Sequence, residues 1–183
     1  MTRSILIASC ALFLAGCGGH VIYPSEAYEG TVVDAETGRP LTDAVVIAIW
    51  YRETNLVVAH GPAVDYHDSY EALTDGAGRF EIPARTHFTL LGGIRQPRFV
   101  VYSPGYASFP SLKAKPSGGD LEQAYAQHRV DFRLTKLTNR EERMRNTDHP
   151  IGTTNLPQSQ TLNLRRLLNA ERQALGLEPY TPR

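Results

Sequence analysis

The stretch Glu71-Ala-Leu-Thr-Asp-Gly-Ala-Gly-Arg-Phe-Glu-Ile-Pro83 decides the fold, because it predicts two strands joined by a tight turn. The turn is Asp75-Gly-Ala-Gly78. Glycine tolerates positive φ there, and the aspartate side chain accepts hydrogen bonds from the backbone that follows it. Apolar and polar residues alternate on both sides, as in a strand with one buried face. We therefore assign Asp75 and Arg79 to the structure of the turn rather than to a site.

Further strands are predicted on either side of this stretch, at Tyr28–Asp34, Asp43–Arg52, Arg98–Tyr102 and Val130–Leu134. The second is rich in β-branched residues and is apolar on both faces between residues 44 and 50. A sheet with one face in water alternates instead. The outer face of this strand, with Val45, Ile47 and Ile49, must therefore be covered.

The C-terminal part of the chain offers a cover. Thr138 and Glu141 are spaced as a capping box that opens a charged helix reaching about residue 146. A second helix is predicted over Ser159–Leu175, because leucines recur there at helical spacing and Gly176 follows as a stop. We expect its leucines to pack on the outer face of the sheet. Docking of the same leucines on a partner protein is the alternative. The leucines are Leu164, Leu167, Leu168 and Leu175.

The order of the turn and strand motifs carries a family resemblance. The motifs are Gly30-x-Val32-x-Asp34, Gly38-x-Pro40-Leu41, Ala44-x-Val46, Thr74-Asp75-x-x-Gly78-Arg79-Phe80-x-Ile82-Pro83 and Pro104-Gly105-Tyr106. Over residues 28–136 this order resembles the carboxypeptidase regulatory-like, or transthyretin-like, domain. The resemblance implies a mainly β fold: a seven-stranded, Ig-like β-sandwich, here with a C-terminal helical extension. These motifs are structural, so they specify the fold better than the function.

The N-terminus predicts an exported, lipid-anchored protein. Arg3 precedes an apolar run from Ile5 to Ala15, which is too short to span a bilayer but suits a secretory signal. The run ends Leu14-Ala-Gly-Cys17, which resembles the bacterial lipobox. That resemblance implies cleavage before Cys17, followed by thioether-linked diacylglycerol and an N-acyl chain on the cysteine. An ordinary cleaved signal with an unmodified cysteine is the alternative.

The predicted organisation is a lipoprotein signal peptide over 1–16, a lipidated cysteine and tether over 17–27, the β-sandwich over 28–136 and the helical extension over 137–183. Gly18 stands where, in well-studied lipoproteins, an aspartate would favour the inner membrane. We therefore expect the periplasmic face of the outer membrane.

Charge and cysteine usage exclude several classes of protein. Basic and acidic residues balance at 19 each, so the sequence predicts no nucleic-acid partner. The two cysteines, Cys10 and Cys17, both lie near the N-terminus, which leaves the rest of the chain without disulfides or thiol nucleophiles. No zinc-carboxypeptidase or hydrolase motif occurs. Intradiol dioxygenases share part of the strand pattern, but the chain lacks their His-x-His spacing and has Phe80 where that family often has a tyrosine.

Two groups of residues are candidate sites. His60, Asp65, His67 and Asp68 could hold zinc or calcium if residues 60–68 fold back on themselves; a polar hairpin loop is the alternative. If residues 67 and 68 begin a strand, their side chains point to opposite faces, which spoils a shared site.

The second candidate is an aromatic platform for a sugar ring, made of Tyr51, Tyr66 and Tyr70. Trp50 lies on the expected core face and is assigned to packing. Taken together, we expect a non-catalytic envelope lipoprotein without a cofactor, which acts as a structural or protein-interaction module. Its partners would be a membrane and an unidentified envelope protein or cell-wall glycan. The alternatives are a carbohydrate-binding or peptidoglycan-binding module and, third, a metal-dependent enzyme that uses residues 60–68.

Overall fold

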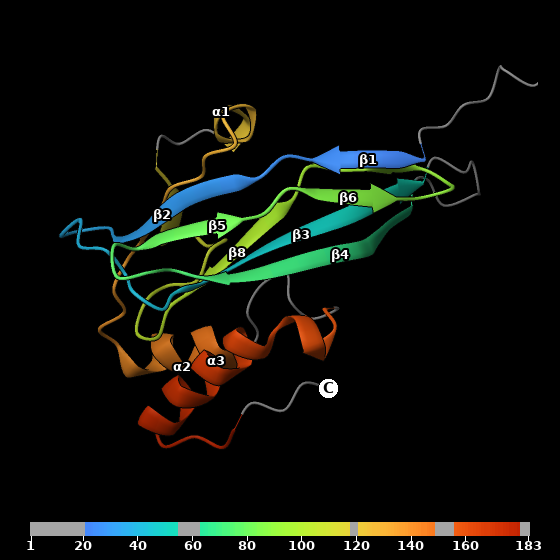
Figure 1. Ribbon diagram of the computed structural model, residues 1–183. Coiled ribbons are helices and arrows are strands. Elements are labelled where there is room, and N and C mark those ends of the chain that lie inside the picture. The colour runs from blue at the N-terminus through green and yellow to red at the C-terminus, as the bar shows by residue number, and fades with distance from the viewer. Residues whose placement is uncertain (1–20, 55–62, 118–120, 149–155, 180–183) are drawn as a thin grey trace, which may run out of the picture.

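The computed structural model describes residues 21–54, 63–117, 121–148 and 156–179 and shows a mainly β fold with three α-helices (Figure 1). The strands are β1 Ile22–Ser25, β2 Tyr28–Asp34, β3 Val45–Thr54, β4 Ala63–Leu73, β5 Arg79–Ile82, β6 Arg85–Phe88, β7 Gly93–Ile94, β8 Arg98–Tyr102, β9 Ala114–Pro116 and β10 Phe132–Leu134. The helices are α1 Leu121–Ala126, α2 Arg140–Asp148 and α3 Leu162–Ala174, with a short 3-10 turn at Gln158–Gln160. These described ranges contain ten strand segments, three of them only two or three residues long, whereas the family resemblance predicts seven strands.

The strands form two four-stranded sheets and a two-stranded ribbon. One sheet has the order β5-β2-β10-β9, with β10 parallel to β2. In the other, β3 pairs with β4 on one side and with both β7 and β8 on the other. The ribbon pairs β1 with β6. The mainly β architecture expected from the sequence is therefore confirmed.

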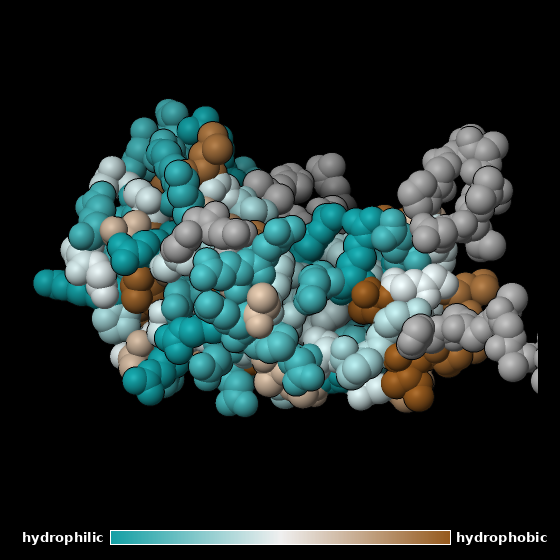
Figure 2. Space-filling view, turned by 90° about the horizontal axis from the view of Figure 1, so that it is seen from above, coloured by the Kyte–Doolittle hydropathy of each residue, from teal (hydrophilic) through white to brown (hydrophobic). Residues whose placement is uncertain are grey.

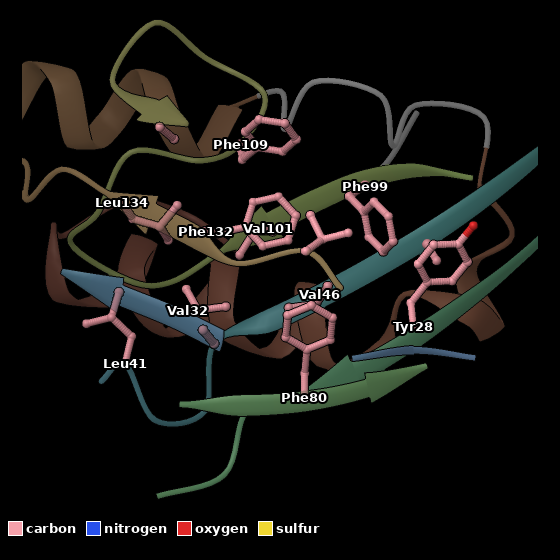
Figure 3. Close-up of a cluster of buried hydrophobic side chains, with 14 of the residues drawn as sticks. Tyr28, Val32, Leu41, Val46, Phe80, Phe99, Val101, Phe109, Phe132 and Leu134 are labelled. Atoms are coloured by element: carbon pink, nitrogen blue, oxygen red, sulfur yellow. The ribbon is translucent and has the colours of Figure 1, made fainter. Parts of the chain in front are cut away.

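Inward-facing side chains of both four-stranded sheets meet in one hydrophobic cluster. Alternation along each strand puts these residues on the inner face, where aromatic rings fill much of the space (Figure 3). Trp50 belongs to this cluster and is almost fully buried, as its position in the strand pattern predicts. Labelled members in Figure 3 are Tyr28, Val32, Leu41, Val46, Phe80, Phe99, Val101, Phe109, Phe132 and Leu134.

The strand predictions match the structure closely. Two of them, Tyr28–Asp34 and Arg98–Tyr102, coincide with β2 and β8. The predicted strand over Val130–Leu134 shortens to β10, but the backbone N–H of Val130 still donates to the carbonyl of Glu29 in β2 at 2.9 Å. Position 30 of β2 requires glycine where the strand passes Val130, because a Cβ atom there would lie 2.0 Å from the carbonyl oxygen of Val130.

The turn at residues 75–78 forms as predicted, but its two flanking strands belong to different sheets. The Oδ1 atom of Asp75 accepts hydrogen bonds from the backbone N–H groups of Ala77 and Arg79, both at 2.8 Å. Gly78 has a φ of +71°, a conformation that L side chains rarely adopt. β4 lies in the sheet of β3, and β5 pairs with β2. The turn therefore carries the chain from one layer to the other.

α3 covers the outer face of the sheet, which confirms the packing predicted from the sequence. Its leucines and the outward residues of β3 and β8 form a second hydrophobic cluster. The members are Val45, Ile47, Ile49, Val100, Tyr102, Leu164, Leu167 and Leu168. Leu175 is buried as well, just after the helix. Because these leucines already contact the sheet, they do not form an open docking surface.

Polar contacts fix the position of the two C-terminal helices. The carboxylate of Glu71 on β4 accepts hydrogen bonds from the first turn of α3, at the backbone N–H groups of Asn163 (2.8 Å) and Leu164 (2.7 Å). A negative charge at this position also complements the helix dipole. Glu171 of α3 is buried and accepts two hydrogen bonds from Arg143 of α2, at 2.7 and 2.9 Å. The two helices are therefore joined to each other and to the sheet.

Two local predictions are wrong. Part of the predicted tether is strand β1, which pairs with β6; a backbone ladder can form without the side-chain periodicity on which the prediction relied. The cap of α2 is Asn139 rather than Thr138, because the Asn139 side chain accepts the backbone N–H of Glu141 at 2.8 Å. Asparagine and threonine are both good helix caps, so the sequence placed the boundary within one residue.

Candidate functional site

A β-bulge brings together polar residues that the sequence analysis separates. The register between β3 and β4 pairs Trp50 with Asp68 and Tyr51 with Tyr66, which leaves His67 as the extra residue. As a result, His67 and Asp68 both approach one histidine, His87 of β6. The ring centroids of His67 and His87 are 5.3 Å apart, and the Oδ2 atom of Asp68 lies 3.8 Å from the Nδ1 atom of His87. The expectation that residues 67 and 68 diverge to opposite faces is wrong, because it assumed a regular strand.

His87 is the centre of this group and is only 3% exposed. The Trp50 ring lies 5.0 Å from it, and the guanidinium of Arg85 binds Asp68 at 3.0 Å. Burial lowers the pKa of His87, the nearby His67 and Arg85 lower it further, and Asp68 opposes them. The neutral imidazole is therefore favoured. Within the described residues its Nε2 atom is buried without a hydrogen-bond partner.

Arg85 also lies over two aromatic rings, at 5.9 Å from the centroid of Trp50 and 5.4 Å from that of Tyr70. These distances are in the range of cation–π attraction. The sequence analysis missed both Arg85 and His87. The signal that could have found them is the alternation in Arg85-Thr-His-Phe88, which places the arginine and the histidine on one face of a strand.

A cavity of about 230 Å³ lies beside His87, between the β1–β6 ribbon and the sheets. Its wall combines aromatic, imidazole and amide groups from Tyr23, Tyr28, Trp50, His87, Gln96 and His128. It is smaller than the roughly 300–1,000 Å³ of typical drug-sized ligand sites, so it suits a small ligand or one sugar ring.

Hydrogen bonds already order part of this wall. The hydroxyl of Tyr28 donates to Oε1 of Gln96 at 2.6 Å, and Nε1 of Trp50 donates to the Ser25 hydroxyl at 3.2 Å. Burial raises the pKa of Tyr28 to about 12, with smaller contributions from neighbouring groups, so this hydroxyl stays protonated near neutral pH. Glu26 and Arg95 also line the cavity, so it can offer ring faces, neutral polar groups and one charge of each sign to a ligand.

The predicted metal ligands do not assemble into one site in the described part of the chain. His60 lies outside the described residues. Asp65 is exposed at the start of β4 and pairs with Arg52 at 3.5 Å, away from the group around His87. Across residues 21–54, 63–117, 121–148 and 156–179, no group of three or more His, Cys, Asp or Glu side chains could hold a metal ion.

The predicted aromatic platform is divided between two faces of one sheet. Tyr51 and Tyr66 are paired across β3 and β4 and pack against the cluster beneath α3. The guanidinium of Arg98 lies 5.0 Å above the Tyr51 ring. Tyr70 packs on the opposite face, in the cluster between the sheets. The three tyrosines therefore do not form one surface. Regular alternation would put Tyr66 and Tyr70 on the same face of β4, but the extra residue at the bulge between them shifts the alternation and separates them.

The family-like motifs have structural roles. Asp34 accepts backbone hydrogen bonds from Glu36 and Thr37, each at 2.9 Å, and its second oxygen accepts one from the Tyr106 hydroxyl at 3.1 Å. These bonds, that from the Thr37 backbone above all, lower the pKa of Asp34. The structure thus joins the strand motif that ends at Asp34 to the Pro-Gly-Tyr turn far along the chain.

Comparison with known proteins assigns no family to this chain. No protein-family model and no curated protein matches the sequence. Among solved structures, the chain is similar to the 3-chlorocatechol 1,2-dioxygenase of Rhodococcus opacus 1CP, with 14% identity and a TM-score of 0.31. The match covers 61% of this chain and 59% of the dioxygenase chain. A likeness this slight carries no argument about activity. No helix in the described residues has the length and apolar character needed to cross a bilayer.

Proposed function

We propose that this protein is a non-catalytic bacterial envelope lipoprotein, anchored through acylated Cys17, whose β domain and helical arm form a structural or protein-interaction module. The observation that carries the proposal is the sequence Leu14-Ala-Gly-Cys17 at the end of an apolar signal-like run. Each acyl chain on Cys17 would contribute about 0.8 kcal/mol of membrane-binding free energy per buried methylene, so several chains together would give stable anchoring. Gly18 favours the periplasmic face of the outer membrane.

The domain type forms part of the proposal: a transthyretin-like sandwich over residues 28–136. Two four-stranded sheets that share one hydrophobic core support it. The Asp34–Tyr106 hydrogen bond and the turn around Asp75 add support, because they give structural roles to the motifs that carry the resemblance.

Mass spectrometry of the mature N-terminal peptide tests the anchor. We expect a thioether-linked diacylglycerol and an amide-linked acyl chain on Cys17, and a protein that sediments with membranes until detergent releases it. Cys17→Ser should abolish both results. Cys10→Ser is the matched control, because it changes the other cysteine of the leader and leaves the lipobox intact. An unmodified Cys17 in the mature protein would refute the proposal.

A second candidate function is binding of a carbohydrate, including a peptidoglycan sugar. The cavity beside His87 favours it, because several aromatic side chains and two histidines line one small space. Titration with muropeptides can be followed by the fluorescence of Trp50, which is the only tryptophan in the chain. We expect Gln96→Ala to weaken binding and Gln158→Ala, before α3, to leave it unchanged. An unchanged Trp50 signal at millimolar muropeptide would exclude this candidate.

A further inference from the structure

Large exposed hydrophobic residues gather at one end of the described structure. We call this surface the apolar end; its members are Val21, Ile22, Val64, Phe88, Leu90 and Leu91. Leu90 is 87% exposed and Phe88 63% exposed. Figure 2 shows hydrophobic residues collected at the end of the molecule where β1 begins and β6 ends. Contiguous exposed apolar surface in a soluble domain marks a contact with another protein or with a membrane.

Backbone pairing shows that these residues belong to one surface. Ile22 and Phe88 are direct partners across the β1–β6 ribbon, so their side chains lie on the same face. The backbone N–H of Thr89 donates to the carbonyl of Val21 at 3.0 Å, and the Thr89 hydroxyl donates to the carbonyl of Leu91 at 2.7 Å. The loop after β6 is therefore held against the start of β1.

Val64 joins this surface through the neighbouring strands. Glu53 near the end of β3 pairs with Val64 on one side and with Gly93 on the other. The loop after β6 and the first residues of β4 consequently meet at the same end of the sheet.

Side chains on the inner face of the β1–β6 ribbon contact the domain, whereas side chains on its outer face are exposed. Tyr23 and His87, the next pair along the ribbon, point inward and line the cavity beside Trp50. Alternation then turns Ile22 and Phe88 outward, where no packing against the domain core is possible. Apolar residues at these positions do not serve the core, so an external contact accounts for them.

We propose that the apolar end enters the boundary between headgroups and acyl chains of the membrane that holds Cys17. This inference rests on the proposed lipid anchor. Val21 is four residues after Cys17, so the intervening chain reaches at most about 14 Å even when fully extended. Amphipathic surfaces of membrane-bound proteins bury to a depth of about 5–10 Å in this boundary. The anchor thus keeps the apolar end within reach of the lipid whatever the orientation of the domain.

The ion pairs at this end do not oppose lipid contact. Arg52 pairs with Asp65 at 3.5 Å, and Arg95 pairs with Glu53 through two hydrogen bonds. The four charges sum to zero, so no net negative charge repels an anionic leaflet. The membrane contact would also fix the orientation of the domain and hold the β1–β6 ribbon at the lipid surface.

Site-specific fluorescence in the full-length lipoprotein tests this inference. Leu90→Cys is labelled with the polarity-sensitive dye NBD, and the protein is reconstituted into vesicles of phosphatidylethanolamine and phosphatidylglycerol. Leu112→Cys is the matched control, because Leu112 is a leucine 94% exposed in the loop between β8 and β9, beside α2. Both positions are exposed, so neither label should disturb folding. A lipid carrying a doxyl quencher high on its acyl chain is then added to the vesicles.

We expect the doxyl lipid to quench the label at residue 90 at least twofold and the label at residue 112 hardly at all. Equal quenching at the two positions, in protein whose Cys17 is shown by mass spectrometry to be acylated, would overturn the membrane contact and leave the lipoprotein proposal standing. Protection of residue 90 from aqueous iodide without quenching by the lipid would indicate a protein partner or a second copy and would overturn it as well. An unacylated Cys17 would remove both proposals.

Discussion

Replacing Leu168 by alanine measures how strongly α3 is held to the sheet. Leu168 is 1% exposed and contacts the outer-face residues of β3 and β8. Truncation of a buried leucine to alanine costs about 2–5 kcal/mol, because apolar contacts are lost and a cavity remains. Alanine is at least as good a helix former as leucine, so the loss reflects packing. For a chain of 183 residues, about 2–4 °C per kcal/mol converts this into a fall in melting temperature of roughly 4–20 °C.

The assay is equilibrium unfolding in urea, followed by the fluorescence of Trp50. This tryptophan is 1% exposed and lies in the cluster between the sheets, on the opposite side of β3 from α3. A shift of its transition therefore shows that loss of helix packing destabilises the whole domain. Leu162→Ala is the control, because Leu162 is 62% exposed at the start of the same helix and should change stability by less than about 0.5 kcal/mol.

A specific result would refute this reasoning. If Leu168→Ala and Leu162→Ala differ by less than about 0.5 kcal/mol, the second cluster does not hold the helix in place. A second, earlier transition in circular dichroism without a change in the Trp50 transition would mean that α3 unfolds separately from the sheets. Both outcomes contradict a single cooperative unit that includes the C-terminal helices.

Three other predictions follow from individual contacts. Glu71→Ala should cost about 1–2 kcal/mol in urea unfolding by removing the cap of α3, and Glu71→Gln should cost less. Burial lowers the pKa of His87 below its ordinary value of 6.5, so below pH 6.5 the unfolded chain binds more protons than the folded one. As the pH is lowered from 6.5 to the pKa of the folded state, the free energy of unfolding should decrease by at most about 1.4 kcal/mol per pH unit, and His87→Gln should remove this slope. Gly30→Ala should cost more than about 3 kcal/mol or prevent folding, because its Cβ would overlap the Val130 carbonyl; a native-like melting temperature would contradict the parallel β2–β10 pairing.

Local patterns in the sequence determined much of the fold. β2 and β8 have the predicted bounds, and Asp75 accepts the turn hydrogen bonds expected of it. Period-two alternation and helical spacing are properties of a few consecutive residues, so these elements can be recognised without knowledge of their neighbours. The apolar outer face of β3 and the leucines of α3 could even be matched with each other, because each surface needed a cover that only the other supplied.

The candidate site was decided by tertiary structure. His87 and Arg85 carry no motif, and they meet Asp68 and Trp50 only because the β1–β6 ribbon lies against the β3–β4 pair. The single extra residue at the bulge then turned His67 towards His87, against the regular alternation that the sequence implied. Strand pairing between distant segments, and a one-residue change of register within it, depend on the balance of many long-range contacts. Local sequence does not encode that balance, so the mainly β architecture could be predicted from the chain while the site could not.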